Sequence, residues 1–236
     1  MSGTDGLTGT GWAAAAWLAA IAAVLTAVGS GWVLRNVPEP SADMLGAEEK
    51  RVYLDLVRPT FVLGVTGVSV AIAGVTGWLL PPALWPPWLV LATFGALLVG
   101  IDAATTWLPN TLMYPARAAM VVAAGVSVAL GGGPTVLLWM AVGSATWGVL
   151  FWLTWWVSRR QIGFGDVRLG FLLGAAAAAA GWQTAYACLL LGTVVGAGWG
   201  LAGRIRHRHN ARQPFAYGPS LLIGCGLGLL TLLWSR

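Results

Sequence analysis

Charged residues are scarce in this chain. They make up 9% of its 236 residues, whereas hydrophobic residues make up 58%, and the mean hydropathy is +0.77. An average soluble domain carries about 25% charged residues. One core of a chain this long could not hide so much apolar surface from water. The composition therefore excludes a soluble globular protein and predicts an integral membrane protein that faces lipid.

Cysteine and histidine are also rare, with two of each. Cys188 and Cys225 both lie inside apolar segments, and they form no C-x-x-C pair. His207 and His209 lie in an Arg-rich run typical of a membrane-anchoring loop, and a metal site needs more ligands than these two. The sequence predicts two buried free thiols, with no metal and no other cofactor.

No Lys or Arg precedes the first apolar run, which begins at Trp12, and the first basic residue is Arg35. A secretory signal has the opposite order, with its positive charge before the apolar run. We therefore expect residues 12–34 to be a retained helix whose N-terminus lies outside the cell.

The apolar windows indicate an all-α fold, because a helix needs about 20 apolar residues to span a bilayer. Both loops that flank 168–203 are basic, so this segment should cross the membrane an even number of times, as two helices. We expect a polytopic bundle of about eight transmembrane helices, forming one domain over 1–236. The windows are 12–34, 60–80, 86–103, 114–132, 134–157, 168–181, 182–203 and 216–234.

Every Lys and Arg except Arg236 lies in or next to four loops. Positive charge marks the cytoplasmic side of a membrane protein, which predicts a multi-pass plasma membrane protein with these loops inside. The net charge of +5 thus reports orientation in the bilayer, and we expect no nucleic-acid partner. The four loops are 35–59, 102–113, 158–167 and 204–215.

Two of the eight acidic residues lie at membrane boundaries. Asp102 ends the apolar run 97–101, and Asp166 immediately precedes the run 167–173. An ionisable residue at such a position is costly and indicates a functional site. Asp166 could instead cap the helix that follows. Asp102 could not, since the C-terminal end of a helix disfavours negative charge.

The surroundings of both aspartates resemble a known family. Residues 163–169, Gly-Phe-Gly-Asp-Val-Arg-Leu, look like the GxGD signature of the type IV prepilin peptidases, a group of membrane aspartyl proteases. Residues 101–110 end in Leu-Pro-Asn and resemble the first motif of that family. Residues 213–219 are similar to the Pro-Phe-Gly-Pro segment that opens its last helix, with Ala216 and Tyr217 inserted. The resemblance covers 88–236.

The resemblance implies an aspartic endopeptidase whose catalytic residues are Asp102 and Asp166. Its substrate would be a type IV prepilin or pseudopilin, cut at the cytoplasmic membrane face to remove a short basic leader. Two carboxylates that share a site cannot both ionise easily. One would then activate water while the other, still protonated, assists the carbonyl oxygen.

Other residues of the two motifs are candidates for shaping the site or binding substrate. Gly163 and Gly165 would let the backbone turn sharply beside Asp166, although an ordinary loop turn also accounts for them. Arg168 could orient a carboxylate or a substrate carbonyl, or it could anchor the helix at the membrane surface. Pro109 and Asn110 close the first motif.

The sequence departs from the larger members of the family, which carry a zinc-binding cytoplasmic domain with paired C-x-x-C motifs after the first helix. Residues 35–59 contain no Cys, so the chain resembles a short form whose N-methyltransferase activity is in doubt. Two other functions stay open: a transporter or ion relay that uses Asp102 and Asp166, and a non-catalytic scaffold of a pilus or secretion assembly. The pilin, its cleavage site and the oligomeric state do not follow from the sequence.

Overall fold

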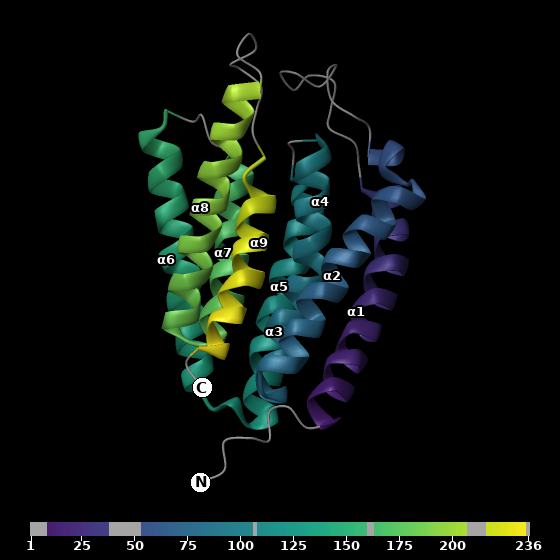
Figure 1. Ribbon diagram of the computed structural model, residues 1–236, viewed down its shortest axis with the longest axis vertical. Helices are drawn as coiled ribbons and strands as arrows, with labels where there is room; N and C mark the ends of the chain where they lie inside the picture. Colours follow the sequence, from purple (N-terminus) through teal and green to yellow (C-terminus); the bar gives the residue numbers. More distant parts are fainter. Residues whose placement is uncertain (1–8, 38–52, 106–107, 160–162, 207–215, 235–236) are drawn as a thin grey trace.

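A computed structural model describes residues 9–37, 53–105, 108–159, 163–206 and 216–234, and helices without strands make up this part of the chain. The α-helices stand side by side as one bundle (Figure 1). They are α1 (Gly9–Asn36), α2 (Pro59–Leu79), α3 (Trp85–Val90), α4 (Ala96–Thr105), α5 (Asn110–Ser127), α6 (Thr135–Val157), α7 (Phe164–Ala179), α8 (Trp182–Arg206) and α9 (Gly218–Leu230).

Several short elements extend these helices. A π-helical turn at Leu91–Gly95 joins α3 to α4, so that the two form one continuous helix. A second π-helical turn, Val128–Gly132, follows α5. A 3₁₀ turn at Tyr53–Leu56 lies within the predicted cytoplasmic loop 35–59, of which 38–52 falls outside the described residues.

Six stretches of the described residues are long and apolar enough to cross a membrane. α7, with 16 residues, and the final helix Gly218–Leu233 are shorter. α7 is buried along nearly its whole length by the helices around it. The predicted all-α polytopic membrane fold is confirmed. The six stretches are Gly11–Asn36, Pro59–Leu79, Pro82–Thr105, Asn110–Gly132, Thr135–Val157 and Trp182–Ala202.

The starts of α5 and α7 differ from the starts of the predicted apolar windows. α5 begins at Asn110 and α7 at Phe164, each four residues before the predicted windows of 114–132 and 168–181. Both helices begin within the motifs themselves and include polar residues, Asn110 in α5 and Asp166 in α7, that the windows left out. As a result, Asp166 lies inside the first turn of α7 and does not precede the helix.

Segment 168–203 forms parts of two helices, as predicted. The chain turns between α7 and α8 at Gly181, whose φ of 112° is a left-handed conformation that favours glycine. Both cysteines are buried and free, and the Cys188 thiol donates to the Cys225 carbonyl at 3.5 Å.

Consecutive helices pack most closely in three pairs, α1 with α2, α6 with α7, and α8 with α9. Small residues allow this close approach, as is common between membrane helices. A Cβ atom on Gly174 of α7 would lie 2.4 Å from the carbonyl oxygen of Gly143 in α6. Between α1 and α2, the hydroxyl groups of Thr26 and Ser69 form a buried hydrogen bond of 2.8 Å.

Candidate active site

The two aspartates lie at the same end of the bundle. Asp102 belongs to the last turn of α4 and Asp166 to the first turn of α7. The chain runs in opposite directions along these two helices, so their ends meet on one side (Figure 1). Each side chain is only 5% exposed. Both carboxyl groups therefore point into the bundle and not toward bulk water.

The start of α9 brings the two helices together around Gly218. A Cβ atom on Gly218 would lie 2.9 Å from Oδ2 of Asp102 and 3.2 Å from Cδ2 of Leu169 in α7. Leu169 follows Asp166 by three residues, so both lie on the same face of that helix. Asp166 is also close enough to Asp102 to experience its charge. The two carboxyl groups thus share one site, enclosed by α4, α7 and α9.

Tyr217 forms another wall of this site. It immediately precedes Gly218 at the start of α9, and its ring meets the Phe151 ring edge-on with 6.1 Å between the centroids. Gly196 of α8 leaves room for it, because a Cβ atom there would lie 2.6 Å from the Tyr217 ring. Sequence reasoning did not include Tyr217 or Gly218 among the site residues. The motif at 213–219 contains both residues and could have indicated them. In the comparison with the Pro-Phe-Gly-Pro segment of the family, Tyr217 counted only as an insertion.

The two glycines of the GxGD motif occupy different positions. Gly163 precedes the first turn of α7 with φ −64° and ψ 139°, an extended conformation open to any residue. A Cβ atom on Gly163 would lie 3.7 Å from Oδ2 of Asp166. Gly165 packs more tightly, since a Cβ atom there would lie 3.3 Å from the side chain of Leu108. Gly165 therefore lets α7 approach the chain that leads from α4 into α5.

The remaining motif residues join the first turns of α5 and α7. Pro109 is the buried residue that precedes α5, and Asn110 is the first residue of that helix. The Arg168 guanidinium donates a hydrogen bond to the Asn110 side-chain oxygen, and it also lies over the Phe164 ring, 4.9 Å from the ring centroid. Through these contacts Arg168 joins the start of α7 to the start of α5.

An apolar groove reaches the site from the lipid-facing surface. It has a volume of about 470 Å³ and runs between α2, α4 and α9. Val99 and Pro219 line it. A Cβ atom on Gly218, the residue beside Asp102, would lie 3.5 Å from the Val99 side chain. A neighbouring pocket that contains Asp55 shares the walls Thr60, Phe61 and Ala104 with the groove. An apolar approach and a more polar pocket therefore meet near Asp102.

Comparisons with known proteins match the segment that holds the site to one family. Residues 89–201, which include both aspartates, match the sequence model described as the type IV leader peptidase family. The prepilin leader peptidase/N-methyltransferase of Aeromonas hydrophila is 30% identical over 173 residues, covering 71% of this chain and 54% of the relative. That of Dickeya chrysanthemi is 29% identical over 179 residues, covering 70% and 57%.

A shorter match to the Escherichia coli K12 protein of the same name is 34% identical over 94 residues, covering 38% of this chain and 40% of the relative. No solved structure matches the chain. The chain spans about half the length of the first two relatives. The resemblance that the motifs indicated is confirmed, because a segment that holds both aspartates matches the type IV leader peptidase family.

Proposed function

We propose that the chain is a membrane aspartic endopeptidase that removes the short basic leader from type IV prepilins or pseudopilins at the cytoplasmic membrane face. One observation carries the proposal: Asp102 and Asp166, from two motifs far apart in the sequence, lie buried together in one site. The match to the family model and the names of the relatives support the same activity. The proposal concerns leader cleavage alone.

In the proposed reaction the ionised carboxylate takes a proton from water, and the water oxygen attacks the carbonyl carbon of the scissile peptide bond. The second carboxyl group, which is protonated, gives its proton to the carbonyl oxygen. The carbon–nitrogen bond then breaks. The amine leaves with the proton held by the first carboxyl group, and a hydroxyl proton returns to the second. The two roles belong to Asp102 and Asp166 as a pair.

The groove between α2, α4 and α9 fits the substrate that the family implies, an apolar helix preceded by a basic leader. Its open, lipid-facing side would admit the apolar helix from the bilayer, and small residues such as Gly64 and Ala103 line it. Asp55 lies in the adjoining pocket, where the polar leader would emerge. A substrate in this position would carry its leader junction past Asp102.

Replacement of either catalytic aspartate by asparagine tests the proposal. Asparagine keeps the size of the side chain but cannot exchange a proton, so Asp102→Asn and Asp166→Asn should each lower cleavage by about 10²–10⁴-fold. The double variant should be no slower than the slower single variant, because the two residues work as a unit. The measurement is the initial rate of leader removal from a matched precursor in membranes that hold equal amounts of each variant.

Glu48→Gln is the matched control, since it removes a carboxylate from the loop 35–59 that belongs to neither aspartate motif. We expect it to cleave at a rate within a few-fold of the unaltered protein. If either catalytic-site variant retained most of the cleavage rate, the aspartic mechanism would be refuted. If the unaltered protein cleaved no precursor, an ion relay or an assembly scaffold would be the better account.

A further inference from the structure

Arg117 is a charged residue well inside a membrane-spanning stretch. It lies in Asn110–Gly132, seven residues after the start of α5, or about 10 Å along the helix. No other charged residue in the six spans is so far from a span end. Its Nε atom is buried and has no hydrogen-bond partner among the described residues. Charged groups at such depth mark functional sites, because leaving them unpaired in lipid is costly.

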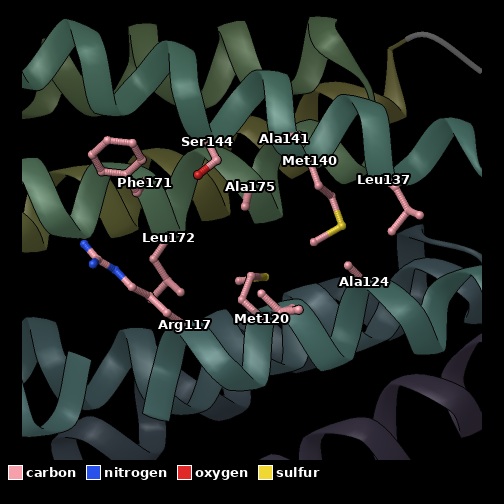
Figure 2. Close-up of a pocket in the computed structure, with 11 residues that line it drawn as sticks. Arg117, Met120, Ala124, Leu137, Met140, Ala141, Ser144, Phe171, Leu172 and Ala175 are labelled. Atoms are coloured by element: carbon pink, nitrogen blue, oxygen red, sulfur yellow. The ribbon is translucent and has the colours of Figure 1, made fainter. Parts of the chain in front are cut away.

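The side chain of Arg117 lies at one end of a cavity of about 480 Å³ between α5, α6 and α7. Figure 2 shows its guanidinium reaching toward Phe171, with Ser144 nearby and Leu137 at the far end. The guanidinium lies 5.9 Å from the centroid of the Phe171 ring. The polar end of the cavity is the end nearer to the starts of α5 and α7.

Apart from Arg117 and Ser144, the lining residues are apolar, and Arg117 is the only one that carries a charge. Met120 and Met140 face each other across the middle of the cavity (Figure 2). The flexible thioether side chains of methionine adapt to ligands of varied shape. Val121, which is 73% exposed, and Leu137, which is 43% exposed, place the mouth of the cavity on the lipid-facing surface.

We propose that this cavity binds one glycerophospholipid, with its phosphate on the Arg117 guanidinium and an acyl chain along Met120, Met140 and Leu137. The fork of N–H donors on arginine matches the geometry of a phosphate group. Basic pockets between membrane helices near the cytoplasmic surface are known lipid headgroup sites. The polarity of the cavity matches that of a lipid whose headgroup lies nearer the end that holds the aspartates.

The lining of the cavity favours a phospholipid over a protein helix. The Arg117 guanidinium, whose Nε atom has no hydrogen-bond partner among the described residues, matches a phosphate group, and the apolar side chains along the rest of the cavity match an acyl chain. A helix with its side chains is about 10–12 Å wide. An extended hydrocarbon chain is much narrower and can follow the row of apolar residues. The lipid site is also separate from the groove beside Asp102, because the two cavities share no lining residue. Its existence does not depend on peptidase activity.

The test is lipid binding by protein purified in a neutral detergent. Dioleoylphosphatidylglycerol is titrated in while thermal unfolding is followed, and phospholipid that remains with the purified protein is counted by mass spectrometry. A ligand of the folded state raises the melting temperature in a concentration-dependent way. For Arg117→Gln we expect at least a tenfold higher half-saturating lipid concentration and loss of the co-purified lipid. Arg117→Lys should be intermediate, because lysine keeps the charge but lacks the fork.

Two further variants complete the design. Arg35→Gln removes an exposed arginine at the same membrane end and should bind lipid as the unaltered protein does. Ala124→Phe fills the apolar end of the cavity, where Ala124 lies opposite Leu137 (Figure 2), and should weaken binding with Arg117 intact. The Ala124→Phe variant tests the proposal even if Arg117→Gln fails to fold. We expect Arg117→Gln to fold, because removing a charge from a membrane span eases insertion.

Three results would overturn the proposal. The first is equal lipid binding by the unaltered protein and both Arg117→Gln and Ala124→Phe. The second is an equal rise in melting temperature with inorganic phosphate alone, which would identify a free anion as the ligand. The third is a peptide in place of a lipid in the purified protein, which would make the cavity a polypeptide site.

Discussion

Gly218 is the residue that allows α9 to begin directly against Asp102. Any larger residue would place a Cβ atom 2.9 Å from the carboxylate oxygen of Asp102 and 3.2 Å from Leu169. Both distances are shorter than ordinary contacts between carbon and these atoms. Asp102 would have to move, and active sites are sensitive to displacements of about 1 Å.

We predict that Gly218→Ala lowers the rate of leader cleavage by about 10-fold to 10²-fold through displacement of Asp102. The protein should still insert and accumulate, because the change is one methyl group at a helix start. Gly226→Ala in the same helix is the control, since a Cβ atom there meets nothing within 4 Å. Rates measured on a matched precursor check this. Equal rates for Gly218→Ala and Gly226→Ala would show that Gly218 does not position Asp102.

The contact between α8 and α9 depends on glycines in both helices. A Cβ atom on Gly224 would lie 2.3 Å from the Cα atom of Gly192 and 2.6 Å from the carbonyl oxygen of Cys188. These are backbone atoms, so no side-chain rotation can relieve the clash. α9 carries Gly218 at its start, which means that this contact also supports the site.

Gly224→Ala should therefore destabilise the bundle by about 1–3 kcal/mol, the usual cost of overpacking. Gly198→Ala in α8 is the matched control, because a Cβ atom there has open space, and alanine favours a helix over glycine. The two melting temperatures in detergent provide the comparison. A Gly224→Ala protein as stable as the Gly198→Ala protein would show that α8 and α9 are not in close backbone contact.

The whole molecule has two ends that differ in charge. The ends of α1, α4 and α6 and the starts of α2 and α7 lie at one end of the bundle, and the turns that follow α5 and α7 lie at the other (Figure 1). Arg35, Arg58, Arg159 and the two aspartates are in or next to the helix ends of the first group. Positive charge marks the cytoplasmic side. We therefore expect the aspartate end to face the cytoplasm, where the proposed substrate would present its leader.

Single cysteines on a background with Cys188 and Cys225 replaced by alanine would test this orientation. Arg159→Cys should be protected from a membrane-impermeant thiol reagent in intact cells and should react only after the cells are opened. Gly131→Cys at the opposite end should react in intact cells. The reverse pattern would place the aspartates outside and would contradict cleavage at the cytoplasmic face.

The sequence by itself determined the membrane character of the protein, most of its helices and the choice of Asp102 and Asp166 as candidate site residues. These properties are local. The hydropathy of a span is a sum over consecutive residues, and the cost of Asp102 or Asp166 at a membrane boundary depends only on that residue and its neighbours along the chain. The starts of α5 and α7 were misplaced by four residues, because polar residues such as Asn110 can continue a helix whose other turns are packed.

Only the tertiary structure decided which groups surround each aspartate. The contact of Gly218 with Asp102, the hydrogen bond from Arg168 to Asn110 and the position of Arg117 in a cavity all join helices far apart in the chain. Such contacts depend on how each helix is rotated about its axis and on how closely its neighbours approach. Glycines at helix contacts set those distances. The sequence does not distinguish a glycine whose Cβ position faces a backbone, as at Gly224, from one whose Cβ position faces open space, as at Gly226.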